Sequence, residues 1–427
     1  MMKNINLKGL DISCYTETLK NGLEVVLVPY DDKKNYFISY ATRFGSEITK
    51  FIPHNSKKKV TVPDGIAHFL EHKMFAQEDG VDPFDYFSKS GTGSNASTSF
   101  NNTQYICYGT KNFEDNLKYL MKFVNSPYYT DDNVSKEKGI IAEEIKMYDD
   151  IPEWKLDSEL KKYIYHVLPR RVDIGGTVKE INKITKEDLY LCYDNFYQPS
   201  NMFILVVGKF DKEKTIKIIR EGLSNREDKG LPIVKKYKEK KNVLKKYGEV
   251  YQDINIPKIG IGLKICCDDL VEKDDLILDL YLEMIMGITF GISSLFREKV
   301  RSQKMINSFS MDWESVENFK TFYIYASTTC PDLLIDEIKK QLFDLSINEE
   351  DFSRMKKVWI ANEVKMIDYV DSTARNIYDD IVRYKRVVNN RIDIIRKLSL
   401  KQLNEIVKQI DFHNISVIKM LPKKEKS

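Results

Sequence analysis

Two stretches of this sequence follow the same order of elements, and they decide the fold. Residues 184–208 read ITKEDLYLCYDNFYQPSNMFILVVG, and residues 398–421 read LSLKQLNEIVKQIDFHNISVIKML. Each stretch has an amphipathic helical pattern, a break, and a run rich in β-branched residues. Asn201 and Asn414 occupy matching places in the two stretches. A pattern that recurs near the end of each half of a chain indicates an internal repeat.

The sequence upstream of these stretches also repeats its order. Strand-like runs at 36–44 and 259–265 precede helical sequence, and further strands are expected over 99–110 and 307–328. Long charged helical stretches follow in both cases. The sequence therefore predicts an α+β fold made of two homologous halves, each an α/β sandwich with a mixed antiparallel sheet and helices.

A basic segment joins the two predicted halves. Residues 225–247 hold nine basic and three acidic residues, together with Gly230 and Pro232, and show little apolar periodicity. We interpret the segment as a solvated basic linker, because Lys-rich runs with Gly and Pro are typical of loops. The predicted organisation is an N-terminal half over 1–224, the linker over 225–247 and a C-terminal half over 248–427.

Composition narrows the class of protein. With 427 residues, of which 42% are hydrophobic and 31% charged, the chain is expected to be globular. Its net charge of +3 gives no support to a nucleic-acid partner. The six cysteines include no C-x-x-C pair and suit a reducing compartment. The start lacks the apolar core of a signal peptide, and charges interrupt the most apolar stretch, 276–296, so we expect a cytoplasmic protein without a membrane span.

One motif carries metal chemistry. Two of only five histidines fall in PDGIAHFLEHKMFA, residues 63–76, as His68 and His72 with Glu71 between them. Asp64 is a candidate N-cap, so the motif is predicted to lie on a helix. At about 100° per residue, the two histidines and Glu71 share one face, and imidazoles one turn apart can hold one ion. Zinc prefers such nitrogen ligands.

The third ligand is expected to be a carboxylate from SKEKGIIAEEIKMYDD, residues 135–150. Glu137 and Glu144 are seven residues apart and share a helix face, whereas Glu143 points away from it. In the simplest assignment, Glu144 binds the metal and Glu137 supports the site from behind the ligands. The geometry of the helix also allows the reverse assignment. Three protein ligands and one open position define a catalytic zinc site. We therefore expect one Zn²⁺ per chain, with Glu71 as the general base that activates a metal-bound water.

An H-x-x-E-H motif followed by E-x6-E resembles the pitrilysin/insulinase family of inverted zinc metallopeptidases, which includes the mitochondrial processing peptidases. Further similar motifs, such as GTGSNASTSFNNTQYICYGT from residue 91, extend the resemblance over nearly the whole chain, and the chain most resembles the bacterial YmfH-like branch. The resemblance implies two halves that form a clamshell around a chamber, with metal in the first half only. It matches His68, His72 and Glu144 to the metal ligands, Glu71 to the base and Glu137 to the supporting glutamate.

The resemblance also implies a peptide-binding strand in the first half. In the second half, the match to the family is incomplete. Family members bind an extended peptide along an edge strand, and the matching residues here are Ser94, Asn95, Ala96, Ser97 and Thr98. Active relatives contribute an Arg and a Tyr, seven residues apart, from the second half. Here Arg301 is present, but Ser308 stands seven positions on, followed by Phe309. Loss of an oxyanion donor slows catalysis about 10²-fold or more.

Two hypotheses follow for the function. The first is a zinc-dependent endopeptidase that hydrolyses peptides or unfolded segments. The alternative is a peptide-binding or scaffold subunit of a two-chain peptidase assembly, with little activity alone. The expected partners are peptide substrates and either a second copy or a metal-less homologue, which would form a homodimer or a heterodimer. The chain contains no G-x-x-x-x-G-K-[ST] and no G-x-S-x-G motif, so nucleotide and serine-hydrolase chemistry find no support.

Overall fold

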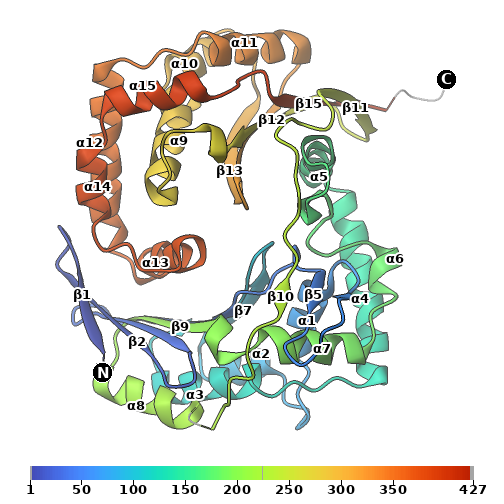
Figure 1. Ribbon diagram of the computed structural model, residues 1–427, viewed down its shortest axis with the longest axis vertical. Coiled ribbons are helices and arrows are strands. Elements are labelled where there is room, and N and C mark those ends of the chain that lie inside the picture. Colours follow the sequence, from blue (N-terminus) through green and yellow to red (C-terminus); the bar gives the residue numbers. More distant parts are fainter. Residues whose placement is uncertain (1, 224, 424–427) are drawn as a thin grey trace. The chain divides into compact units, whose positions relative to one another are not determined.

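The computed structural model describes residues 2–223 and 225–423, which form two compact units. Unit 1 contains the described residues of Met1–Lys146, Val172–Lys236 and Glu363–Arg391, and unit 2 those of Met147–Arg171, Tyr237–Asn362 and Ile392–Ser427. Both units combine a mixed sheet with helices, which confirms the predicted α+β class. Figure 1 shows the elements of each unit and labels most of them.

Unit 1 is built on a seven-stranded sheet with the order β1-β2-β3-β9-β4-β8-β7. Its strands are β1 (Lys3–Leu7), β2 (Ile12–Thr18), β3 (Glu24–Pro29), β9 (Met202–Gly208), β4 (Tyr36–Thr42), β8 (Thr103–Gly109) and β7 (Gly93–Thr98). A small second sheet holds β10 (Ile233–Val234), β5 (Lys50–Ile52) and β6 (Val60–Thr61). The central strands β4 and β9 are buried along their whole length.

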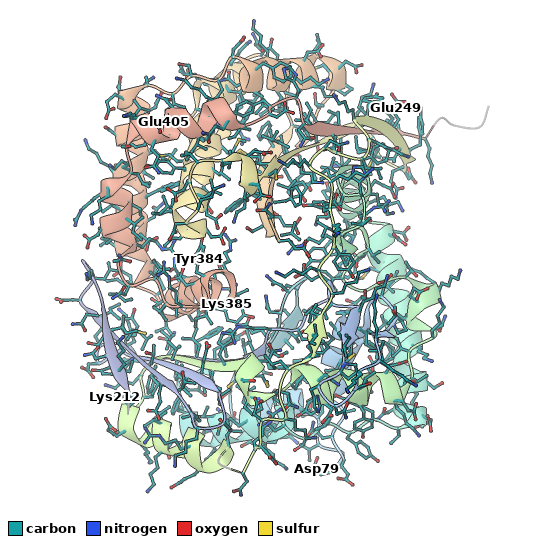
Figure 2. The ribbon with its side chains drawn as sticks, in the orientation of Figure 1. Asp79, Lys212, Glu249, Tyr384, Lys385 and Glu405 are labelled. Carbon is teal, nitrogen blue, oxygen red and sulfur yellow. The ribbon has the colours of Figure 1, made fainter. Side chains whose placement is uncertain are left out.

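Helices cover both faces of the large sheet of unit 1. The helices of unit 1 are α1 (Ile66–Met74), α2 (Pro83–Lys89), α3 (Phe113–Val124), most of α4 (Asp131–Asp149), α6 (Val178–Ile181), α7 (Lys186–Phe196), α8 (Lys212–Leu223) and α13 (Val370–Tyr384). Helices α1 and α3 contact β8 on the face that carries the main core, and α13 packs on β9 and β4 over a separate apolar cluster. Lys385 follows α13 with a φ of 53° and lies beside Tyr384 (Figure 2).

Unit 2 is built on a five-stranded sheet with the order β11-β15-β12-β14-β13. Its strands are β11 (Tyr247–Gln252), β15 (Ile415–Pro422), β12 (Lys258–Cys266), β14 (Phe319–Ser327) and β13 (Ser308–Val316). Its helices are α5 (Pro152–Ile164), α9 (Asp275–Phe290), α10 (Leu295–Ser302), α11 (Pro331–Phe343), α12 (Glu349–Met366), α14 (Arg391–Lys397) and α15 (Leu400–Gln409). The stretch Asp275–Ser302 is apolar and long enough to cross a membrane, but 67% of its most apolar window is buried, as in a core helix.

The two sheets share one topology, which confirms the predicted repeat. The order β3-β9-β4-β8-β7 in unit 1 corresponds to β11-β15-β12-β14-β13 in unit 2. The first pair of strands is parallel in both units, and every following pair is antiparallel. Asn201 directly precedes β9 and Asn414 directly precedes β15, as their matching places in the sequence predict.

The compact units differ from the two contiguous sequence halves, because each half gives one helical segment to the other unit. Helix α5 belongs to unit 2, and α13 belongs to unit 1 (Figure 1). Helix α5 buries an apolar stripe of Leu156, Leu160 and Ile164 against β12 and β15. Gly262 of β12 permits this close approach, since a Cβ there would lie 2.2 Å from the Cδ1 atom of Ile164. The predicted boundaries at 224 and 248 therefore differ from the bounds of the compact units.

The basic linker is only partly solvated, which corrects our expectation for 225–247. Its lysines are exposed, but the side chains of Glu239 and Lys264 are 0% exposed and pair at 2.7 Å. Glu239 also accepts hydrogen bonds from the backbone N–H groups of residues 166–168. A buried carboxylate needs such partners to offset its lost hydration. The linker is therefore anchored into unit 2 at this carboxylate.

Candidate metal centre and active site

The H-x-x-E-H motif lies on α1, as predicted, but the helix begins differently. Its N-cap is Gly65, with a φ of 86° and no side-chain cap, so the expectation of Asp64 as the N-cap is wrong. A Cβ on Gly65 would lie 2.4 Å from the carbonyl oxygen of Gly175. Glycine is therefore required both by its left-handed backbone and by the close approach of the 175–176 loop. This loop passes beside His68, because a Cβ on Gly175 would lie 3.7 Å from Nδ1 of that histidine.

His68, His72 and Glu144 come together in unit 1. The two imidazole rings have centroids 4.5 Å apart, and Nε2 of each ring faces the carboxylate of Glu144, at 3.8 Å for His68 and 3.5 Å for His72. One candidate ligand atom from each side chain lies within 4.8 Å of the others. Among the described residues, no further His, Cys, Asp or Glu joins this group. The three donors thus face one another from α1 and α4.

Glu137 supports the outer side of His72. Its Oε1 atom lies 3.1 Å from Nδ1 of His72, and its Oε2 atom accepts a hydrogen bond of 3.1 Å from Nζ of Lys73. The side chains of Lys73 and Glu137 are only 6% and 13% exposed. Since Nδ1 of His72 donates to Glu137, the lone pair of this imidazole lies on Nε2, the side that faces Glu144.

The electrostatics of the site set the protonation of its groups. Burial, and to a smaller extent the neighbouring His72, lower the pKa of His68 to about 4, against an opposing effect of Glu137. Burial also acts to lower the pKa of His72, but the hydrogen bond to Glu137 and the nearby carboxylates raise it overall. For Glu137, burial raises the pKa, whereas the bonds from His72 and Lys73 lower it, and the net shift is downward. A neutral His68 offers a lone pair, which is the form that binds metal.

Glu71 lies on the same helix and contacts the sheet. The Thr98 hydroxyl, at the end of β7, donates to its Oε2 atom at 2.9 Å. Glu71 is 8% exposed, and burial raises the pKa of its carboxyl group, against the opposing effects of His72 and Thr98. It makes no other hydrogen bond among the residues that the structure describes. Its Oε1 atom is therefore free to act as a proton acceptor.

The donor set fits zinc. Two imidazoles and one carboxylate are the ligands of catalytic zinc sites, whereas structural sites close with four protein ligands that are often cysteines. The six cysteines are all free, and none belongs to the three-residue group. Nδ1 of His68 is buried without a hydrogen-bond partner among the described residues, so only the Nε2 side of this ring faces another polar side chain of the site.

The predicted peptide-binding residues lie on β7. Among the residues that the structure describes, this strand is the last in its sheet and pairs only with β8, so no strand pairs with its outer edge. Asn95 and Ser97 are exposed, and Ser94 and Ala96 are half-buried. Arg301 lies on α10 of unit 2 with an exposed side chain, and its role in binding stays a prediction. Phe309 lies on β13, where the guanidinium of Arg297 covers its ring at 4.2 Å.

Two contacts of the site could not be predicted from the sequence, namely those of Lys73 with Glu137 and of Thr98 with Glu71. Lys73 directly follows His72, and its position gives no sign that the ammonium group is buried against Glu137. Thr98 belongs to the predicted peptide-binding strand, whose expected role lies in its backbone, whereas its hydroxyl contacts Glu71. The only sequence signal for either contact is proximity to the motif, because both depend on how α1 packs against α4 and β7.

Comparison with known proteins places the chain in a family. The model of the insulinase family, peptidase family M16, matches residues 59–172, and the model of the peptidase M16 inactive domain matches residues 183–358. The first match contains the H-x-x-E-H motif and Glu144. The chain belongs to the M16 family of peptidases.

Particular relatives extend this similarity over the whole chain. The chain is 34% identical to the zinc protease YmfH of Bacillus subtilis over 432 residues, with 99% of this chain and 100% of that protein covered. It also resembles the crystal structure of an M16-like peptidase from Alicyclobacillus acidocaldarius, with a TM-score of 0.90, 29% identity, and 98% and 100% of the two chains covered. A protease from Helicobacter pylori shares the fold, with a TM-score of 0.79, 20% identity, and coverage of 96% and 99%.

Proposed function

We propose that this chain is a zinc-dependent endopeptidase that hydrolyses peptides or unfolded segments. The observation that carries the proposal is the convergence of His68, His72 and Glu144 within 4.8 Å, with Glu71 on the same helix as the two histidines. His68, His72 and Glu144 would hold one zinc ion, and Glu137 would orient His72. The names of the relatives, which are zinc proteases, support the choice of metal.

Different residues of the chain would bind the metal, transfer the proton and hold the peptide during hydrolysis. Zinc, when bound, supplies Lewis acidity and lowers the pKa of water to about 7. The carboxylate of Glu71 takes a proton from the attacking water and gives it to the departing amine. The free edge of β7 binds an extended peptide by main-chain hydrogen bonds, which demand little of the peptide's sequence. Ser94 to Ser97 therefore hold the substrate beside α1, with which β7 is in contact.

The test uses Glu71→Gln, which keeps the size of the side chain but removes its basicity. The expected result is full zinc binding and a loss of peptide cleavage of about 10²-fold or more. Glu143→Gln is the matched control, because Glu143 is exposed and its ion pair among the described residues is with Lys146 at the surface. Unchanged, chelator-sensitive cleavage by the Glu71→Gln protein would contradict the role of the base.

A second candidate function is that of a peptide-binding or scaffold subunit in a two-chain assembly. Ser308 and Phe309, in place of a tyrosine, favour it, since neither can supply a phenolic hydroxyl to the substrate carbonyl. The complete set of His68, His72, Glu144 and Glu71 favours the peptidase. Incubation of the chain with a mixed peptide library, with and without zinc, chelator and a metal-less homologue, separates the two. Absence of chelator-sensitive cleavage in every combination would support the scaffold.

A further inference from the structure

Thr98 links the edge strand β7 to the carboxylate of Glu71. It is the last residue of β7, and its hydroxyl lies 2.9 Å from Oε2 of Glu71. The hydroxyl of Thr103, its cross-strand neighbour, lies 3.4 Å away and donates its own proton to the carbonyl of Phe44 at 2.9 Å. The proton of Thr98 is therefore available to Glu71, whose carboxylate can only accept it.

The backbone that carries Thr98 is held firmly. The N–H of Ser99 donates to the carbonyl of Asn102 at 2.8 Å and closes the turn between β7 and β8. The hydroxyl of Tyr378, on α13, donates to the side chain of Asn102 at 2.5 Å, and both residues are buried in unit 1. The N–H of Ser46 donates to the carbonyl of Ser99 at 3.0 Å. A donor fixed by this many contacts can hold a carboxylate in one orientation at little entropic cost.

Glu71 depends on this single donor. Thr98 is its only hydrogen-bond partner among the residues that the structure describes, and Glu71 is only 8% exposed. Without the hydroxyl, the carboxylate could rotate about its terminal torsion, which is broad and roughly two-fold. The orientation of its free Oε1 atom would then no longer be fixed by the sheet.

We propose that Thr98 is a positioning residue that holds Glu71 in its working orientation and links it to the strand that pairs with peptide. The proposal rests on the peptidase function proposed above. Thr98 does not touch the reacting atoms; it acts through Glu71. Because Thr98 ends the strand along which the peptide would lie, a shift of β7 on peptide binding would move the hydroxyl and the carboxylate together.

Thr98→Val tests the proposal, because valine keeps the shape of threonine and removes the hydroxyl. With a fluorogenic peptide and the zinc-loaded full chain, we expect kcat to fall about 10-fold while KM and zinc content stay within two-fold. Thr98→Ser restores the hydroxyl and should recover kcat to within three-fold of the natural protein. Thr18→Val, an exposed substitution on β2 of the same sheet, is the matched control and should change neither constant.

A crystal structure of the zinc-loaded Thr98→Val protein gives a readout that does not depend on activity. We expect Glu71 to occupy more than one rotamer there and a single rotamer in the natural protein. Three results would each overturn the proposal: an unchanged kcat, a serine variant as slow as the valine variant, or an unaltered Glu71 rotamer. If the natural chain cleaves no peptide in any combination, the proposed function fails, and the Glu71 rotamer still decides the role of Thr98.

Discussion

Replacement of Glu137 by glutamine should reveal how the outer contacts of the site support metal binding. The carboxylate now serves two donors, with His72 Nδ1 and Lys73 Nζ each 3.1 Å from a different oxygen. Glutamine replaces one of these two oxygens by an NH₂ group, so the donor that faced that oxygen loses its acceptor. The Glu137→Gln protein must therefore leave either the imidazole or the buried ammonium group without an acceptor.

The magnitudes follow from these two contacts. Loss of the partner that orients a metal-binding histidine lowers metal affinity by about 10- to 100-fold. Loss of a hydrogen bond to the charged Lys73, which is 6% exposed, should lower the free energy of unfolding of the metal-free protein by about 2 kcal/mol. Competition with a zinc chelator measures the first effect, and urea denaturation in the presence of chelator measures the second.

Two further variants separate the effects. Adding Lys73→Met to Glu137→Gln removes the stranded ammonium group, so we expect stability to recover while zinc affinity stays low. Glu143→Gln, at an exposed position on the same helix, should change neither quantity, because surface ion pairs contribute little. A zinc affinity of the Glu137→Gln protein within two-fold of the natural value would refute the assignment of Glu137 as the support of His72.

Three other predictions concern stability, and denaturation by urea measures each of them. Gly262→Ala should lower the free energy of unfolding by about 1–3 kcal/mol, since the new Cβ would lie 2.2 Å from Cδ1 of Ile164. Ile164→Val removes this Cδ1 atom and should relieve most of the loss. If Gly262→Ala costs the same with isoleucine and with valine at position 164, the packing of α5 is contradicted. Gly139 is an exposed residue in the middle of α4, and a Cβ added to it would have nothing within 4 Å. Gly139→Ala should therefore raise the free energy of unfolding by about 0.5–1 kcal/mol. A loss of stability would contradict this expectation. Burial alone would raise the pKa of Glu239, but the hydrogen bonds from Lys264 and the backbone lower this pKa overall. The ionised carboxylate should therefore stabilise the protein at neutral pH, and this stabilisation should be lost as the pH falls below about 4.5. Glu239→Gln should flatten the dependence of the unfolding free energy on pH, and an unchanged slope would refute the prediction.

The repeated topology could be predicted because its signals are local. A helical pattern, a break and a β-branched run recur at 184–208 and 398–421, and they become α7 with β9 and α15 with β15. The residues of the candidate site could also be found from spacing, since helical periodicity places His68 near His72 and Glu137 on the face of Glu144. Neither inference needed to know which elements pack together.

The exchange of α5 and α13 between the units could not be predicted in this way. An amphipathic pattern such as Leu156, Leu160 and Ile164 shows that a helix has an apolar face, but not which of two similar sheets it covers. The choice depends on details such as Gly260 and Gly262 of β12, beside which these side chains lie. Glu239 was missed for a related reason, because a single carboxylate in a lysine-rich segment looks solvated until its backbone partners are known.

The two units share a fold but differ in the side chains that the corresponding helices carry. Helices α1 and α9 occupy the same place in the chain order, after the central strands β4 and β12 and before the edge strands β7 and β13. On α1, His68 and His72 lie four residues apart and face Glu144. On α9, Leu282 and Met286 also lie four residues apart, and they line a cavity of about 200 Å³ together with Met311, Asp312 and Lys320. Backbone topology alone therefore does not produce the candidate metal site, which depends on the side chains of His68, His72 and Glu144.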